Sequence, residues 1–264
     1  MQRVFAAACV LVATVPSSAA VEGQSPWQGY GSVGVGLLPD FEGARTYETL
    51  PYVEGRLNYD NYYVRIEGSE VRFNVVDDDS FHAGPLVGFR RGRHDMDNSP
   101  VSLLRHYDDT ETAGGFVEYE HVADDPRSGE TVTLLAEDAI VGAASGWTAT
   151  LRATIRRPVE FVDPGLIATV EGDIGWASTS YMRTGFGIDP AYAAASGLPA
   201  FAPKSGFEVA GVAFSLDQFL SRHWSVGLDL HYGRLLGDAA ASPVTAIAGS
   251  ANQYFAGFTV GYVL

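Results

Sequence analysis

The stretch from Trp224 to Tyr232, WSVGLDLHY, alternates strictly between apolar residues and polar or small ones. Successive side chains of a β-strand point to opposite faces. One face therefore carries Trp224, Val226, Leu228, Leu230 and Tyr232, and the other carries Ser225, Gly227, Asp229 and His231. An apolar face with aromatic ends, opposite a face with a charge in mid-strand, is typical of a transmembrane β-barrel strand whose polar face lines a lumen. From this segment alone, a soluble sandwich that buries the apolar face stays open.

Three further stretches repeat the pattern, at 147–156, 166–176 and 253–264. Their polar faces hold Arg152, Glu171 and Asp173, whereas the opposite faces are apolar. Strands of about 9–11 residues match a tilted crossing of the bilayer. After residue 20 no run of 18 apolar residues occurs, so the sequence predicts no transmembrane helix.

Alternation and turn residues together predict an all-β chain that forms a closed antiparallel transmembrane barrel of about twelve strands. The expected strands are 27–37, 47–57, 61–67, 69–76, 81–91, 112–121, 130–138, 146–156, 166–176, 207–217, 223–234 and 253–264. Bacterial barrels have even strand numbers and send their long loops outward. With loops 92–111, 177–206 and 235–252 outside and both termini periplasmic, the chain must reverse near Gly68-Ser69. Ten strands is the alternative, and merging 61–76 into one strand would give eleven.

The first twenty residues have the three parts of a secretory signal peptide. Arg3 supplies the positive charge, residues 4–15 are apolar, and Ser18 and Ala20 are small residues at an expected cleavage site after Ala20. Cys9 is the only cysteine and lies inside the apolar run, so lipidation is a weak alternative. Residues 21–264 then form an exported barrel without disulfides.

Composition excludes several classes of function. Lys and Arg total 17 against 32 Asp and Glu, a formal charge of −15, so the chain would repel nucleic acid. Charged residues make up only 19% of the chain, below the roughly 25% of ordinary soluble domains, and the composition argues against a helical membrane protein and a disulfide scaffold.

The last third of the chain carries a family resemblance. YMRTGFGI at 181–188, SGLP at 196–199 and LLGDAAASPV at 235–244 are followed by GSANQ at 249–253. Near the N-terminus, PDFEG at 39–43 and LPY at 50–52 also fit. This order resembles the MipA/OmpV family of Gram-negative outer-membrane proteins, over nearly all of the chain after residue 20. Two positions depart from the family pattern: Ala241 replaces an acidic residue, and Leu264 replaces a terminal Phe.

The resemblance implies an outer-membrane protein without an assigned active site. Some family members are described as scaffolds that join a murein-cleaving transglycosylase to a murein synthase. A small-solute pore and, less favoured, a barrel enzyme acting on lipid or peptide are the alternatives. Expected partners are outer-membrane lipid and lipopolysaccharide, together with murein hydrolase or synthase proteins. The turn formers Gly237-Asp238 and Ser242-Pro243 predict a rigid loop folded over the barrel mouth.

No residue is expected to be catalytic, to bind a cofactor or to bind a metal. The six histidines lack zinc spacing, and the acidic clusters 77–79, 108–111 and 124–125 lack calcium-loop spacing. Outward clusters could share divalent ions with lipopolysaccharide. His231 and Asp229 form a same-face base–orienter pair, and a Ser–His or Asp–His pair within hydrogen-bond reach would favour an enzyme. Arg90, Arg91 and Arg93 are expected either to bind lipid phosphates or to anchor the barrel at the interface.

Overall fold

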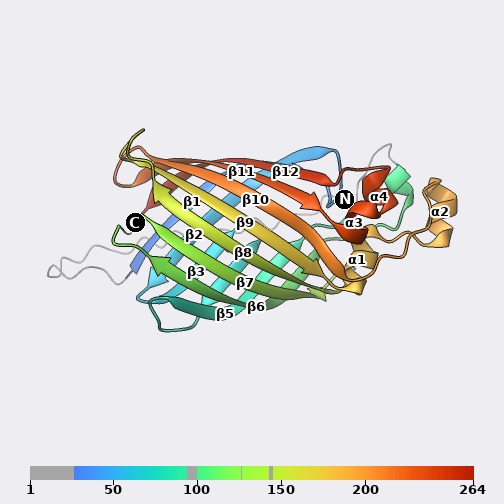
Figure 1. Ribbon diagram of the computed structural model, residues 1–264, viewed down its shortest axis with the longest axis horizontal. Helices are drawn as coiled ribbons and strands as arrows, with labels where there is room; N and C mark the ends of the chain where they lie inside the picture. Colours follow the sequence, from blue (N-terminus) through green and yellow to red (C-terminus); the bar gives the residue numbers. More distant parts are fainter. Residues whose placement is uncertain (1–26, 94–99, 126, 143–144) are drawn as a thin grey trace, which may run out of the picture.

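The computed structural model describes residues 27–93, 100–125, 127–142 and 145–264. Twelve strands, each antiparallel to its neighbours, close into one barrel, because the first strand pairs with the last (Figure 1). The strands are β1 (Trp27–Pro39), β2 (Tyr47–Tyr59), β3 (Tyr62–Glu67), β4 (Glu70–Asn74), β5 (Phe81–Arg90), β6 (Thr110–Val122), β7 (Gly129–Val141), β8 (Trp147–Pro158), β9 (Leu166–Ala177), β10 (Gly206–Phe219), β11 (Trp224–Leu235) and β12 (Asn252–Val263). Among the described residues, no helix is long and apolar enough to cross a membrane.

The predicted barrel of twelve strands is confirmed, and the counts of ten and eleven are wrong. The reversal at Gly68-Ser69 exists, with Gly68 in the left-handed region at φ 57°. Several strands run beyond the predicted bounds: β6 begins at Thr110 rather than 112, and β7 ends at Val141 rather than 138. Backbone pairing continues there past the regular alternation and across a β-bulge, with Thr112 opposite Ala139 and Glu111 opposite Val141. The predicted signal peptide lies outside the described residues.

The outer surface of the wall is apolar between two belts of aromatic side chains, one near each end of the barrel. Leu228, midway along β11, is 40% exposed, and Phe258, midway along β12, is 52% exposed. Near one end lie the exposed rings Trp27, Tyr59, Tyr62, Phe81, Tyr119, Trp224 and Tyr262, and near the other lie Phe89, Trp147, Trp176, Phe207 and Tyr254. An apolar band between aromatic girdles is the surface of a barrel embedded in lipid.

The two ends of the barrel differ. The helices α1 (Thr179–Phe186), α2 (Pro190–Ser196), α3 (Gly237–Ala241) and α4 (Pro243–Ala246) gather at one end, whereas the C-terminus lies at the other (Figure 1). All three predicted long connections lie at the helical end. Since long loops face the exterior in such barrels, the end with short turns faces the periplasm.

The outer loops fold into a cap with its own apolar core. Phe41 and Ala44 come from the β1–β2 connection, and Val101 and Leu104 from η1 (Pro100–Leu103) and the residue after it. The same cluster contains Ile188, Leu198, Val244 and Ala248, all at most 6% exposed. Four loops that are far apart in sequence therefore share one buried contact surface at the outer mouth.

Candidate functional site

The barrel encloses a cavity of about 2350 Å³ whose lining reaches both mouths. At the periplasmic end the lining includes Gln28 and Leu264, and at the outer end it includes Asp40 and Ala248. The polar strand faces line the space between, as the alternation predicted. Open channels and closed barrels both have polar interiors, so the contacts that cross the lumen distinguish them.

A cluster of ion pairs crosses the lumen at mid-height. Arg152 on β8 reaches Glu67 at 3.5 Å and Glu70 at 3.8 Å, beside the turn between β3 and β4. Four strands separate β8 from β3 around the wall, so these contacts span the interior. Glu67 also pairs with Arg72, and with Arg65 at 3.7 Å. We call Arg65, Glu67, Glu70, Arg72 and Arg152 the central cluster.

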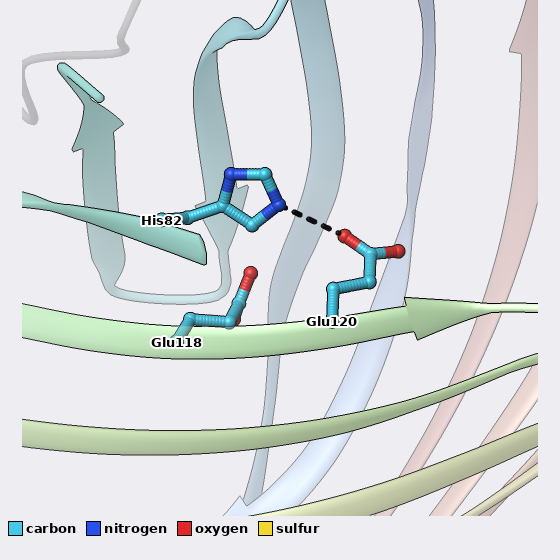
Figure 2. A group of neighbouring side chains, drawn as sticks. All are labelled: His82, Glu118 and Glu120. Carbon is cyan, nitrogen blue, oxygen red and sulfur yellow. Dashed lines mark ion pairs between the residues drawn. The ribbon is translucent and has the colours of Figure 1, made fainter. Parts of the chain in front are cut away.

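A second group lies nearer the periplasmic end. Glu118 on β6 accepts hydrogen bonds from Tyr63 at 2.8 Å, Arg72 at 3.2 Å and Thr133 at 2.8 Å. Glu120, two residues on and on the same face, pairs with Arg56 at 3.3 Å and lies 3.5 Å from the His82 ring (Figure 2). Since Arg56 comes from β2 and Glu120 from β6, this pair also crosses the interior.

His82, Glu118 and Glu120 are close enough to be tested as a metal site. One possible ligand atom from each lies within 4.8 Å of the others (Figure 2). The carboxylates, however, already have cationic partners in Arg72 and Arg56, so a metal ion would have to displace an arginine. The geometry therefore favours an ion-pair network. Sequence spacing could not find this group, because His82 and Glu118 meet only through the pairing of β5 with β6.

The arginine run at the start of the loop after β5 faces protein rather than lipid phosphate. Arg90 bonds to Glu137 at 3.1 Å, to Thr148 at 2.9 Å and to the carbonyl of Gly146. Arg93 is 2% exposed and donates to the carbonyls of Gly185 and Arg105. Arg91 crosses to Glu48 and to the carbonyl of Pro39. The expectation of lipid-phosphate binding or interfacial anchoring is therefore wrong for Arg90 and Arg93, which join strands and loops, whereas the Arg91 side chain bridges to Glu48 and is still 28% exposed.

His231 does face the lumen, but its predicted partner is wrong. Its Nε2 lies 3.0 Å from Oδ2 of Asp173 on β9, rather than bonding to Asp229. The strand between them carries Gly211, where a Cβ would come within 2.4 Å of both side chains. Because Gly211 has no side chain, His231 on β11 can reach across β10 to Asp173 on β9. An Asp–His pair therefore exists, formed by Asp173 and His231. Among the described residues, no hydroxyl group is hydrogen-bonded to the His231 ring.

The motif at 235–244 lies in the cap. Asp238 accepts a hydrogen bond from the backbone N–H of Lys204 at 2.8 Å, and Ser242 donates to the carbonyl of Phe186 at 2.6 Å. The Ser242 side chain also accepts from the N–H of Val244 at the start of α4. Ala241, where the family has an acid, is exposed on α3. The motif thus ties the α3–α4 loop to α1, as expected of a rigid loop over the mouth.

The half-buried phenol of Tyr181 connects two cap loops to each other and to the barrel wall. Tyr181 on α1 donates to Glu42 at 2.6 Å, and the Arg90 guanidinium lies 4.9 Å from the centre of its ring. Burial raises the pKa of Tyr181 well above its ordinary value, so the phenol stays protonated and remains the donor. This contact joins the β1–β2 connection to the loop after β9.

Ser242→Ala is expected to loosen the cap. The change removes a helix N-cap and a buried hydrogen bond, a cost of about 1–2 kcal/mol. Limited proteolysis of intact cells should then cut the outer loops faster than in the wild type. Ser221→Ala is the matched control, because Ser221 accepts from Trp224 in a periplasmic turn and should leave outer cleavage unchanged. Equal cleavage rates for wild type and Ser242→Ala would contradict this role of the motif.

The acidic clusters are distributed between the two ends. Asp77, Asp78 and Asp79 lie in the turn before β5, and Asp124 and Asp125 in the turn after β6, both on the periplasmic side. These two clusters therefore cannot share ions with lipopolysaccharide in the outer leaflet. Only 108–111 lies at the outer end, and there Asp109 accepts a hydrogen bond from the N–H of Gly92.

Several solved outer-membrane proteins resemble the chain at low sequence identity. Solved structures similar to the chain include the NanC porin, with 9% identity, TM-score 0.46, and coverage of 90% of this chain and 100% of that one. An outer membrane channel from Pseudomonas putida F1 has 10% identity and TM-score 0.47 over 90% and 95% of the two chains. The outer membrane channel DcaP of Acinetobacter baumannii has 8% identity and TM-score 0.40 over 90% and 96%. No curated protein sequence matches the chain.

The family comparison covers most of the chain. The family described as MltA-interacting protein MipA matches residues 32–264, which includes every strand from β2 to β12 and most of β1. Together with the lipid-facing band and the closed barrel, this match places the protein in the bacterial outer membrane. The chain belongs to the MipA family.

Proposed function

We propose that the protein is a non-catalytic adaptor that holds a murein-remodelling enzyme at the periplasmic face of the outer membrane. The observation that carries this proposal is an exposed apolar tip on two neighbouring periplasmic turns. Phe161 is 91% exposed, Val162 64% and Leu220 66%. Clustered apolar side chains beyond the strand ends mark a contact surface for another molecule. The family description, MltA-interacting protein MipA, names a protein partner, MltA.

Hydrogen bonds hold the apolar tip in place. Asp163 accepts from the N–H of Gly165 at 2.8 Å and from Gln218 on β10 at 2.9 Å. The hydrogen bond from Gln218 and, to a smaller extent, that from Gly165 lower the pKa of Asp163 below its usual value and keep its carboxylate charged. Arg127, from the next turn around the rim, donates to the carbonyl of Pro164 at 3.0 Å. A surface that is already ordered loses little conformational entropy when a partner binds.

Charge around the tip favours a protein partner over lipid. Glu160 and Asp163 flank the tip in sequence, and the turns at 77–79 and 124–125 add five more acids to the same end. Arg127 pairs with Glu160 and Asp125, which leaves Asp163 and the other four acids to set the charge of this end. An acidic rim repels anionic lipid headgroups and attracts a partner with a basic face. Phe161 would then supply the apolar anchor and the acids the orientation.

The interior supports an adaptor rather than an enzyme. The Asp173–His231 pair could hold a proton, but hydrolysis would also need a nucleophile within reach of the ring. The ion pairs of the central cluster cross the space that a substrate would occupy.

On the outside, the apolar band contacts membrane lipid, and lipopolysaccharide surrounds its outer half.

A photo-crosslinking residue at position 161 tests the adaptor role in living cells. We expect a covalent adduct with a periplasmic murein enzyme, identified by mass spectrometry, and loss of that enzyme from a pull-down of Phe161→Asp. The matched control is the same photo-crosslinker at Leu103, which is apolar and 54% exposed but lies in the outer cap. Adducts at 161 with lipid alone, or the same protein captured from both positions, would overturn the proposal.

A small-solute channel is the second candidate, and the cavity that reaches both mouths favours it. In that case the central cluster would act as a constriction and the cap as an outer filter. Conductance distinguishes the two functions, because an adaptor needs no open path.

A further inference from the structure

The barrel wall is incomplete in its outer half, between β2 and β5. The β3–β4 hairpin contains strands of only 6 and 5 residues, whereas the others have 10–14. On β2 the pairing with β3 ends at Glu54, although β2 continues for seven more residues toward the outer end, to Tyr47. On the other side, pairing of β4 with β5 ends at Gly88. The tip at Gly68-Ser69 thus lies partway up the wall.

Above that tip, backbone groups of β2 face a gap. The carbonyl of Val53 accepts from the N–H of Gly68, so Val53 directs its backbone groups away from β1. Because these directions alternate along an antiparallel strand, Thr49 and Pro51 direct theirs to the same side. Within the described residues no strand pairs with β2 there. Proline has no N–H to leave unpaired, and it is confined to edges of this kind.

The gap lies at the depth of lipid. Pro51 is opposite Val35 on β1, and Val35 is opposite Phe258 on β12, midway between the rings of Tyr254 and Tyr262. Val35 and Phe258 are both more than half exposed on the lipid-facing surface. Unpaired backbone at such depth is tolerated only where it is buried in protein or lines a water-filled cavity. Leu50, Pro51 and Tyr52 do line the main cavity.

A single side chain closes the top of this gap. Arg91, just beyond β5, extends across to Glu48 on β2 and to the carbonyl of Pro39 at 3.3 Å. Below this bridge, β2 and β5 are separated by the width of the hairpin, three strand spacings or about 14 Å. Side chains narrow this gap, but in the part of the chain that the structure describes no backbone pairing joins β2 to β5 across it.

We propose that this gap is a lateral portal through which an anionic single-chain amphiphile passes between the outer leaflet and the lumen. The inner side of the gap is apolar, since Tyr52 and Phe255 contact each other at 5.2 Å between ring centres and Leu50 lies beside them. An acyl chain fits there, and its charged head, directed outward as in the outer leaflet, meets the guanidinium of Arg91. The portal is independent of the adaptor role, which concerns the opposite end of the barrel.

Labelling with two thiol reagents tests the portal. Cys9, the only cysteine, precedes the barrel, so Leu50→Cys gives a single thiol at the gap once residues 1–20 are omitted. Ala213→Cys places the control thiol on β10, also lining the cavity but far around the wall. In vesicles of phosphatidylcholine, a long-chain N-alkyl maleimide should label position 50 about tenfold faster than 213, because the chain concentrates the reagent in the bilayer. A sulfonated, water-soluble maleimide should label both alike.

The Arg91 bridge provides a second readout. Arg91→Ala should speed labelling of Leu50→Cys by the alkyl reagent. In the protein that retains Arg91, added lauric acid should slow this labelling. Arg157→Ala is the matched control, because Arg157 also pairs a strand end with a glutamate, Glu130, but at the periplasmic rim. If Leu50→Cys does not fold, Ser69→Cys at the hairpin tip replaces it, since Ser69 also lines the cavity. Equal alkyl labelling at the gap and at 213, or no effect of Arg91→Ala, would overturn the proposal.

Discussion

Deletion of Gly261–Leu264 is expected to abolish insertion into the outer membrane. These residues close the barrel, since Gly261, Tyr262 and Val263 lie opposite Ser32, Gly31 and Tyr30 of β1. The N–H of Leu264 donates to the carbonyl of Gly29 at 2.9 Å. Removing them opens about 13 Å of paired edge at the periplasmic end of the seam between β1 and β12, and unpaired N–H groups are not tolerated where this seam enters the lipid. The truncated chain should lose heat-modifiable migration on a denaturing gel and should be degraded by added protease.

The matched control for this deletion is Leu264→Phe. It keeps the full length of β12 and restores the aromatic end that such barrels generally have. Leu264 is 69% exposed at the end of the chain, so a ring there has space. We expect a yield equal to or higher than that of the wild type. A truncated chain that still gives a protease-resistant, heat-modifiable barrel would contradict the closure described above.

Leu228→Arg is expected to destabilise the barrel by about 2–4 kcal/mol, because it places a charge near the bilayer midplane. Leu228 lies halfway between Trp224 and Tyr232, and its side chain is exposed to lipid. Unfolding in urea with lipid vesicles present would measure the loss of free energy.

Asp229→Leu, one residue further along the same strand, is the control. Asp229 lines the lumen, and its Oδ2 is buried without a hydrogen-bond partner, so replacing it should cost much less. If Asp229→Leu lowered stability more than Leu228→Arg, the assignment of the two faces would be inverted.

The strands and their faces could be predicted because both depend on local pattern. Alternation along β11 and β12 placed Leu228 and Phe258 toward lipid and Asp229 toward the lumen, and the structure confirms each. The requirement for an even number of strands also located the reversal at Gly68-Ser69. The short predicted strands around it contained the signal of an incomplete wall, but strand length alone does not show where a hairpin sits between its neighbours.

Contacts across the lumen could not be predicted in this way. Alternation turns Arg152 inward, but its partners Glu67 and Glu70 depend on the circumference and stagger of the closed barrel. For the same reason His231 was paired with its neighbour Asp229, whereas the room left by Gly211 lets it reach Asp173. Arg90 and Arg93 were misjudged because their partners, such as Glu137 and the carbonyl of Gly185, lie on distant strands and loops.

Conductance in a planar bilayer tests most directly whether the protein acts at its rim rather than through its lumen. The cap core narrows the outer mouth, and the ion pairs between Arg152 and Glu67 and Glu70 cross the lumen at mid-height. We predict that the purified wild-type barrel gives no resolved current steps, whereas Arg152→Ala combined with Glu67→Ala gives small steps, because the cross-lumen pairs are gone. Stable steps from the wild type, unchanged in the double variant, would contradict the account and establish a channel.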